Sequence, residues 1–238
     1  MAEKVVIGNA ELWHGDCREV LQTLVADAIV TDPPYGIGFV HSGNDGGVGG
    51  LGHGRYKTKF GGVKIAGDDM AFDPSFIKSR GLPTVLWGAN HYASRLDDSS
   101  AWLCWDKRAA SGHTNDFSDC ELAWTNRRGV ARMFRHHWDG MMRASERGIE
   151  RQHPTQKPIA VMEWCIQQLG SPAVVCDPYM GVGSTGVAAM NLGLHFIGVE
   201  IHRPYFDIAC ERIERAQRQA PLVPFELAPV PQQQGLGL

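Results

Sequence analysis

The stretch that most constrains the fold is a short apolar run that leads directly into two prolines, Val30–Tyr35 (VTDPPY). β-Branched residues dominate the run, which is too short for a helix, so it predicts a buried parallel strand. Proline cannot donate to a sheet ladder, and the pair therefore ends the strand. Asp32 and Tyr35 are expected at the carboxyl end of that strand, where open α/β sheets build their sites. An Asp-Pro pair is also an ordinary turn opener.

Strand and helix patterns alternate along the rest of the 238 residues. Further strands are expected at 11–14, 83–87, 101–105, 121–125, 173–177 and 194–200. Helices are expected at 17–24 behind an Asp16 N-cap, at 90–96, from 159 to 169, up to 191, and at 204–218. This order predicts one α/β domain over residues 1–220, followed by a loose Pro/Gln-rich tail at 221–238.

Composition excludes several classes of protein. No apolar run approaches the roughly 20 residues of a membrane span, and the N-terminus shows no apolar core of a signal peptide. The six cysteines are scattered without a Cys-x-x-Cys pair, which argues against a zinc ribbon, a disulfide framework or another metal site and favours a reducing cytoplasm. The net charge is −3, so a nucleic-acid partner would have to meet a local basic patch.

Two stretches could supply such a patch. Residues 43–62 contain nine glycines and the basic residues Arg55, Lys57 and Lys59 against one acid, which predicts a mobile basic loop beside the Asp32 turn. Residues 127–151 hold seven arginines against three acids, with aromatic residues between them. Arginine with aromatics is the mixture that binds phosphates and stacks on bases. The alternative for residues 43–62 is a surface loop without a function, and the alternative for residues 127–151 is a solvated surface with a few buried aromatic residues.

A glycine-rich turn follows the strand expected at 173–177. Gly181, Gly183 and Gly186 form G-x-G-x-x-G, and Glu200 ends the next strand, as in sites that bind the adenosine part of NAD or of another cofactor. Asp177 and Pro178 precede the glycines, which suits a ligand with a positive ammonium rather than a pyrophosphate. Thr155 and Lys157 could bind the carboxylate of that ligand. A P-loop is excluded because no lysine follows Gly186.

Four motifs together resemble the DNA amino-methyltransferases: Asp32–Tyr35, His153–Pro158, Asp177–Gly183 and Glu200. Their order resembles the permuted (β) class, in which the catalytic motif precedes the cofactor motif, and the resemblance runs from about Trp13 to Arg212. The cofactor loop has Tyr179 where many relatives have Phe, and there is no large separate target-recognition domain.

The resemblance implies a Rossmann-like S-adenosylmethionine-dependent methyltransferase fold, with a mostly parallel central sheet and helices on both faces. It implies that the 11–14 strand lies beside the strand ending at Glu200, and that DNA is the partner, with no membrane; the chain could be a monomer or a homodimer. The catalytic residues implied are Asp32, Pro33, Pro34 and Tyr35. The cofactor residues implied are Asp16, Cys17, Thr155, Gln156, Lys157, Asp177, Pro178, Tyr179, Gly181, Gly183, Ser184, Thr185 and Glu200. The DNA-binding residues expected are Arg55, Lys57, Lys59, Arg132, Arg135 and Arg143.

The chemistry expected is transfer of a methyl group to the N6 amine of a flipped adenine. The Asp32 carboxylate and the Pro33 carbonyl would accept the two amine N–H groups, and Tyr35 would stack on the base. The same acceptor pair would serve the N4 amine of cytosine, although Asp at position 32 favours adenine. Methylation at cytosine C5 would need a Pro-Cys pair, which the chain lacks. An NAD-dependent oxidoreductase and a DNA-binding module without activity are the alternatives from other classes.

Overall fold

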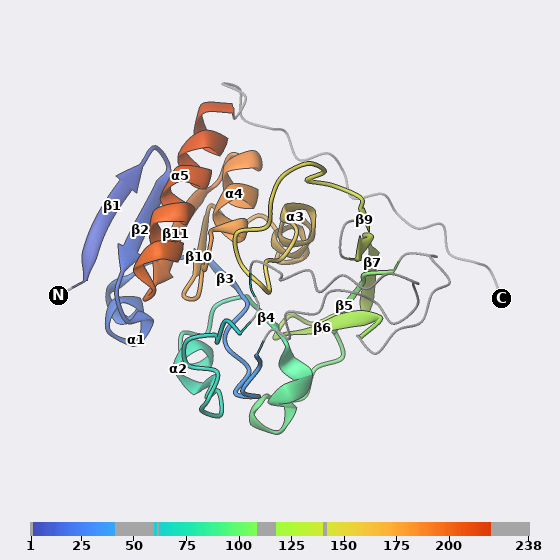
Figure 1. The fold of residues 1–238 in the computed structure, drawn as a ribbon. Coiled ribbons are helices and arrows are strands. Elements are labelled where there is room, and N and C mark those ends of the chain that lie inside the picture. The colour runs from blue at the N-terminus through green and yellow to red at the C-terminus, as the bar shows by residue number, and fades with distance from the viewer. Residues whose placement is uncertain (1, 41–59, 61, 109–117, 140–141, 220–238) are drawn as a thin grey trace.

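Five parallel strands form the centre of a nine-stranded sheet. The computed structural model describes residues 2–40, 60, 62–108, 118–139 and 142–219. The central strands, in spatial order, are β2 (Ala10–His14), β11 (His195–Glu200), β10 (Val174–Asp177), β3 (Ala28–Thr31) and β4 (Thr84–Trp87). Each of these pairs in parallel with its neighbour. Figure 1 shows them running through the middle of the molecule.

Antiparallel strands extend the sheet on both sides. β1 (Glu3–Ile7) forms a hairpin with β2. On the far side lie β6 (Cys120–Thr125), antiparallel to β4, then β5 (Leu103–Asp106) and the edge strand β7 (Arg132–Arg135). A separate small hairpin joins β8 (Trp138–Asp139) to β9 (Met142–Arg143).

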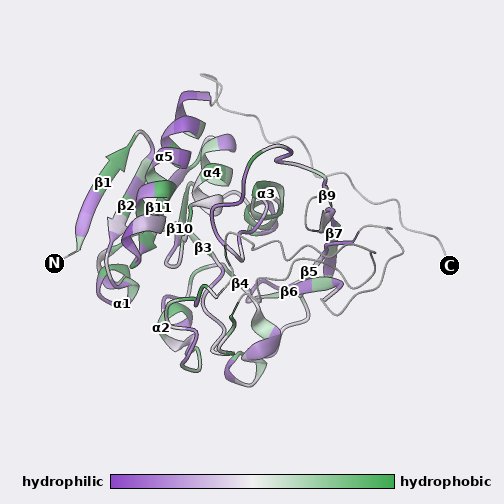
Figure 2. Ribbon diagram, in the orientation of Figure 1, coloured by the Kyte–Doolittle hydropathy of each residue, from purple (hydrophilic) through white to green (hydrophobic). Residues whose placement is uncertain are grey.

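Helices cover both faces of the sheet, as expected for this fold class. On one face lie α3 (Ile159–Gln168), α4 (Ser184–Asn191) and α5 (Arg203–Gln219). The other face carries shorter helices: α1 (Cys17–Val20), η1 (Leu21–Thr23), α2 (Ser75–Lys78), η2 (Ala89–His91) and η3 (Ala93–Arg95). Figure 2 shows hydrophobic residues gathered in the central strands and hydrophilic ones along α5. Among the described residues, no helix has both the length and the apolar character needed to cross a bilayer.

The two cores follow from the alternation of side chains along the central strands. Val30 and Val175 point into the core under α3, α4 and α5, whereas Ile29 and Cys176 point into the core on the other face. Successive residues of a strand face opposite sides of the sheet. A strand covered on both faces therefore needs a continuous apolar run, which is what made these strands visible in the sequence.

Most expected elements are present, with ends that differ by one or two residues. The proposed neighbour of the last strand is confirmed, because β11 pairs in parallel with β2. Two expected helices are different: the 17–24 segment is α1 followed by the 3₁₀ turn η1, and the 90–96 segment is a pair of 3₁₀ turns. Between that pair the Tyr92 side chain is buried and its hydroxyl donates to the Trp87 carbonyl at 2.6 Å, so packing sets the backbone there.

Several elements were not predicted at all. The hairpin strand β1, the short helix α2 and the strands β7 to β9 carry exposed or mixed residues without a clean period. The region 127–151 thus contains three strands. Most of the glycine-rich stretch at 43–62 and the tail at 221–238 lie outside the described residues.

Gly186 is where α4 comes closest to its neighbours. A Cβ added there would collide with Ile213 Cδ1 of α5 and would lie 2.7 Å from Phe196 Cε1 of β11. We expect Gly186→Ala to lower the free energy of unfolding by about 1–3 kcal/mol, the usual cost of overpacking a core. Urea unfolding would measure it. In the control Gly129→Ala the new Cβ would stand 3.7 Å from the Cβ of Ala101, so a similar loss in both variants would contradict the packing argument.

Candidate active site

Three acidic side chains stand at the carboxyl ends of neighbouring strands. Asp32 follows β3 directly, Asp177 is the last residue of β10, and Glu200 is the last residue of β11. β3 pairs with β10 and β10 pairs with β11, all in parallel. The three carboxyl groups therefore meet at one edge of the sheet, which is where open α/β sheets bind ligands.

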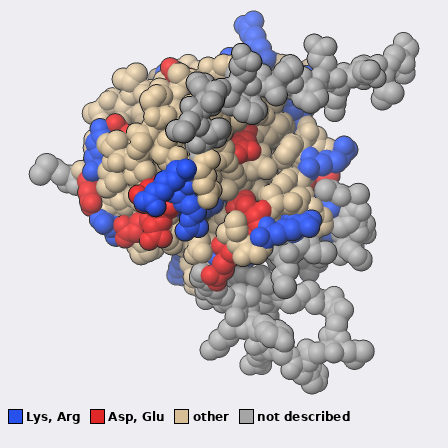
Figure 3. Space-filling model, turned by 90° about the horizontal axis from the view of Figure 1, so that it is seen from above, with Lys and Arg blue, Asp and Glu red and all other residues tan. Residues whose placement is uncertain are grey.

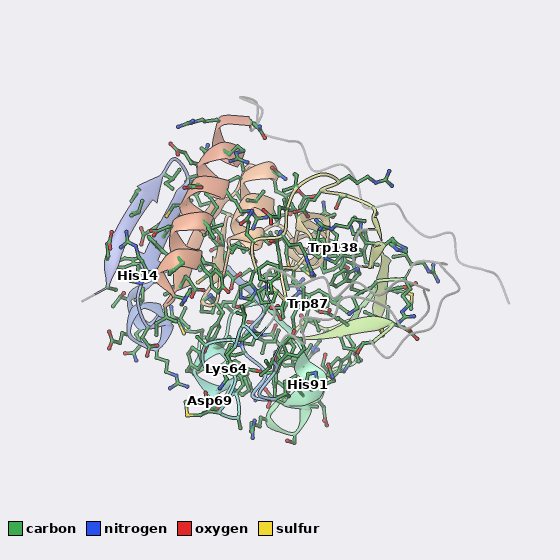
Figure 4. The ribbon with its side chains drawn as sticks, in the orientation of Figure 1. His14, Lys64, Asp69, Trp87, His91 and Trp138 are labelled. Atoms are coloured by element: carbon green, nitrogen blue, oxygen red, sulfur yellow. The ribbon has the colours of Figure 1, made fainter. Side chains whose placement is uncertain are left out.

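The turn after β3 holds the Asp32 carboxylate rigidly. The Tyr35 hydroxyl donates to Asp32 Oδ1 at 2.5 Å. The Tyr35 ring stacks on His91, with ring centroids 5.1 Å apart and planes inclined by 14°. Figure 4 places His91 on the turn that follows β4. Gly88, at the start of that turn, has φ +66°, and a Cβ there would collide with the Tyr35 ring, so glycine is required at this position.

The second oxygen of Asp32 belongs to a row of charges. Lys157 Nζ lies 2.5 Å from Asp32 Oδ2 and 3.1 Å from Glu121 Oε2, and Lys107 Nζ lies 3.0 Å from Glu121 Oε1. Burial raises the pKa of Asp32 against the opposing effect of Lys157. Burial would also raise the pKa of Glu121, but the two lysines hold it at about 2. Burial would lower the pKa of Lys157, but Asp32 and Glu121 raise it above its ordinary value.

The Asp177 carboxylate connects the end of β3 to the glycine-rich turn. Its Oδ1 accepts the Thr31 hydroxyl at 2.6 Å and the Tyr179 N–H at 3.0 Å, and its Oδ2 accepts the Thr185 hydroxyl at 2.6 Å. Asp177 is 2% exposed. Burial raises its pKa to about 6, although all three hydrogen bonds act in the opposite direction.

Glu200 holds the other side of the same turn. Its two oxygens accept the Gly181 N–H at 3.0 Å and the His202 N–H at 2.6 Å. Burial raises its pKa. The Ile201 N–H forms a further hydrogen bond to this carboxylate. A carboxylate has about four acceptor sites, so at least one remains for a ligand hydroxyl. A Cβ added to Gly181 would meet no heavy atom within 4 Å, so the backbone there borders open space.

The segment from His153 to Pro158 borders both the Asp32 turn and the glycine-rich turn with Glu200. His153 Nδ1 is 3.2 Å from the Thr155 N–H and 3.1 Å from its hydroxyl. Burial lowers the pKa of His153 to about 4, so the ring is neutral at physiological pH. Gln156 accepts the Gln152 N–H at 2.9 Å. Lys157, which the sequence assigned to a ligand carboxylate, points instead toward Asp32.

The Asp32 turn and the glycine-rich turn with Glu200 line one cavity of about 580 Å³. This volume is within the usual range for small-molecule sites. It is lined by the following predicted site residues: Asp32, Pro33, Tyr35, Thr155, Gln156, Lys157, Asp177, Tyr179, Gly181, Ser184, Thr185 and Glu200. The other predicted catalytic and cofactor residues do not line it: Asp16, Cys17, Pro34, Pro178 and Gly183. Asp16 caps α1 by accepting the Arg18 N–H at 2.9 Å, and the Tyr179 hydroxyl is hydrogen-bonded to the Cys17 thiol.

Sequence reasoning missed several residues of this cavity. Glu121 and Lys107 come from the antiparallel part of the sheet, and His91 backs the Tyr35 ring. Asp68, 3% exposed, accepts the N–H groups of Gly36 at 2.8 Å and Phe39 at 2.6 Å, so it shapes the chain after the catalytic turn. The glycine directly after the 83–87 strand was the one available signal, because it marks a close approach of backbone to a neighbour.

The predicted DNA-binding residues fall into two groups. Arg55, Lys57 and Lys59 lie outside the described residues. Arg132 and Arg135 are exposed on the edge strand β7, and the Arg143 guanidinium lies over the Trp138 ring, 5.0 Å from its centroid. Trp138 itself is buried in the interior (Figure 4). On the face seen in Figure 3, basic and acidic side chains alternate in small groups.

The comparisons with known proteins agree with this geometry. Residues 107–211 match the DNA methylase family (N6_N4_Mtase). A putative methylase of Escherichia coli K12, YubD, is 28% identical over 228 residues, which cover 86% of this chain and 90% of that protein. The type II methyltransferase M2.DpnII of Streptococcus pneumoniae is 36% identical over 78 residues, 32% of this chain and 29% of that protein. Over these residues the chain is similar to DNA methylases, in agreement with the resemblance that its motifs carry.

A solved DNA methyltransferase structure supports the fold. The PvuII DNA methyltransferase, titled cytosine-N4-specific, covers 87% of this chain and 87% of its own length with a TM-score of 0.56 at 14% identity. The fold class predicted from the sequence is thereby confirmed. The matched residues 107–211 contain Glu121, Lys157, Asp177 and Glu200, but neither the Asp32 turn nor the cavity residues between 37 and 105.

Asp177 predicts a pH dependence of stability. Its pKa in the folded protein, about 6, lies above the ordinary value of 3.8, so the folded protein keeps a proton that the unfolded chain loses. This carboxyl group therefore destabilises the fold as pH rises from about 4 through 6, by at most about 3 kcal/mol. In Asp177→Asn that dependence should vanish, so the variant should gain stability relative to the wild type over the same pH range.

Urea unfolding of both proteins at several pH values between about 4 and 7 would measure the difference. The exposed Asp207→Asn on α5 serves as control for removal of a surface carboxyl. A stability difference between Asp177→Asn and wild type that stays constant with pH would contradict the assignment.

Proposed function

We propose that the chain transfers a methyl group from S-adenosylmethionine to the exocyclic N6 amine of adenine in DNA. One observation carries the proposal: the Asp32 turn and the Gly181–Glu200 site line the same cavity in a chain that is similar to DNA methylases. A methyl donor and an amine acceptor must meet within one enclosed space, and this cavity offers a distinct set of side chains to each.

The cofactor half of the cavity suits S-adenosylmethionine. The Glu200 carboxylate keeps acceptor capacity that fits a ribose hydroxyl, and Asp177 lines the cavity where a positive ammonium would be favoured. The open space beside Gly181 admits a ligand close to the backbone. When bound, the cofactor supplies a methyl group activated by a sulfonium. Thr155 and Gln156 face the same cavity and are candidates for its carboxylate end.

The same features disfavour a dinucleotide. In a Rossmann dinucleotide site, the N–H groups of the glycine turn and of the following helix receive the pyrophosphate. Here the Gly181 N–H already donates to the Glu200 carboxylate, and the Tyr179 N–H donates to Asp177. Two carboxylates beside the turn would repel a pyrophosphate. The NAD-dependent alternative therefore has little support.

The catalytic half acts on the amine. The exocyclic amine is a poor nucleophile because its lone pair is delocalised into the ring. The Asp32 carboxylate and the Pro33 carbonyl would accept its two N–H groups, which would favour a tetrahedral nitrogen with its lone pair free; both residues line the cavity. Alignment of this kind can contribute about 7–11 kcal/mol. Asp32, held by Tyr35 and Lys157, also stands ready to accept the proton that the amine releases.

The preference for adenine over cytosine rests on Asp32. In the family, Ser is commoner at this position in cytosine-N4 enzymes, and this chain has Asp. The base must leave the duplex to reach the cavity, and Tyr35 lines the cavity as the aromatic ring on which it would stack.

Methylation of DNA followed by analysis of the nucleosides tests the function. The wild type should produce N6-methyladenine with S-adenosylmethionine as donor. Asp32→Ala should lower the methyl-transfer rate at least 100-fold, because Asp32 accepts a hydrogen bond from the amine and then the proton that the amine releases. The affinity for S-adenosylhomocysteine should stay within about threefold of wild type. Tyr35→Phe, which keeps the ring, is the matched mild variant. N4-Methylcytosine as product would overturn the base assignment, and an active Asp32→Ala would remove Asp32 from the mechanism.

DNA binding gives a further prediction for the edge strand β7. Arg132 and Arg135 are both exposed there, and Arg135 lies 3.6 Å from Asp106. If they read base edges, replacing both with Gln should change which sites are methylated, because each good contact contributes about 1–3 kcal/mol of discrimination. Arg218→Gln, on the exposed last turn of α5, is the control. Methylation maps identical to wild type for the β7 variant would contradict a reading role.

A further inference from the structure

Four charged side chains of alternating sign form a row across the wall of the cavity. Asp32, Lys157, Glu121 and Lys107 follow one another, joined by N–O distances of 2.5, 3.1 and 3.0 Å. The two inner residues, Lys157 and Glu121, each form ion pairs with both of their neighbours in the row. Lys157 binds two carboxylates, and Glu121 binds one ammonium with each of its oxygens.

The row connects parts of the chain that no motif joins. Asp32 follows the parallel strand β3, and Lys157 precedes helix α3. Glu121 comes from the antiparallel strand β6, where it pairs opposite Trp105 of β5. Lys107, two residues after Trp105, therefore shares the face of the sheet on which Glu121 lies. Lys157 thus gives the β5–β6 pair a direct link to the Asp32 carboxylate.

Lys157 depends on both carboxylates. Its side chain is 6% exposed, and a buried ammonium is costly unless it is paired. With Asp32 as its sole partner, Lys157 would compete with the target amine for the Asp32 oxygens. The second ion pair, to Glu121, holds the ammonium in place while Asp32 accepts the amine.

We propose that Glu121 is a positioning residue of the methyl-transfer site, which keeps Lys157 in register with Asp32 and, through its own negative charge, sets the pH range in which Asp32 works. The proposal rests on the proposed function. Glu121 lies in no motif that the sequence singled out, and its effect on the amine passes through Lys157 and Asp32.

The sign of the pH effect follows from the groups around Asp32. Burial raises the pKa of Asp32, Lys157 and the Tyr35 hydroxyl lower it, and the negative charge of Glu121 raises it. Asp177 and Tyr92 are the other titratable groups that feel the Asp32 charge. Removing the charge of Glu121 therefore lowers the pKa of Asp32, so the ionised carboxylate persists to lower pH.

Glu121→Gln and Glu121→Asp separate charge from shape. The Gln variant keeps the length and loses the charge, whereas the Asp variant keeps the charge and shortens the reach. Glu211→Gln, on the exposed side of α5, removes one negative charge far from the cavity and serves as control. The measurements are the single-turnover methyl-transfer rate as a function of pH, the dissociation constant for S-adenosylhomocysteine, and urea unfolding of each variant.

We expect the acid limb of the Glu121→Gln profile to move to lower pH by about one unit or more. Its plateau rate should fall by between about 10-fold and 100-fold, as for a misplaced catalytic group, with cofactor affinity within about twofold. Glu121→Asp should keep the acid limb of the wild type at an intermediate rate. An acid limb unmoved in Glu121→Gln, or equal loss of rate in both variants, would overturn the proposal.

A titration that needs no activity separates this proposal from the function. Carbon-13 NMR of the labelled Asp32 carboxyl should show a lower pKa in Glu121→Gln than in the wild type, and no change in Glu211→Gln. If the wild type failed to methylate DNA while Asp32 responded as expected, the proposed function would fall and the coupling of Glu121 to Asp32 would stand. An unchanged Asp32 titration would overturn the coupling itself.

Discussion

The hydrogen bond between the Thr31 hydroxyl and Asp177 is the contact on which the site depends. It spans 2.6 Å and joins residues 146 positions apart, at the ends of the paired strands β3 and β10. At the other end of the same pair, the Asp27 carboxylate accepts the N–H groups of Ala173 and Val174 at 3.0 and 2.8 Å. A carboxylate at each end thus fixes the register of the two strands. The register in turn decides how far the Asp32 turn lies from the glycine-rich turn.

The cavity concentrates charge where an apolar lining would be more stable. Burying ion pairs costs desolvation that their mutual attraction often fails to recover, so a row of four charges is weak evidence for stability. The carboxyl groups of the cavity differ instead in pKa, because their surroundings differ. Asp177 and Glu200 have raised pKa values from burial, whereas Glu121 between two lysines has a pKa of about 2. Carboxyl groups of one cavity whose pKa values are shifted in opposite directions are typical of active sites.

The sequence allowed prediction of the buried strands and of the turns that follow them, because both depend on neighbouring residues. Strands such as β3 and β10 are buried on both faces, so their runs of apolar residues are continuous, and the prolines and glycines after them mark where the chain turns at the ligand edge. Asp32, Asp177 and Glu200 were found because each ends a strand. Glu121 was not, because its partners Lys107 and Lys157 lie 14 and 36 positions away, and an acid at the start of a half-buried strand looks like any surface residue. The strands within 127–151 were hidden by side chains that alternate in neither burial nor polarity.

The pairing of β2 with β11 has a consequence for how the protein is made. β2 is translated early and must wait for β11, about 180 positions later, before it gains its parallel neighbour. Strand β3 likewise meets β10 only after about 145 further residues have left the ribosome. Contacts between such distant segments slow folding, and unpaired strand edges are prone to aggregate meanwhile. The β3–β4 and β5–β6 pairings are available much earlier, so the part of the sheet that carries Glu121 can exist before the cofactor strands emerge.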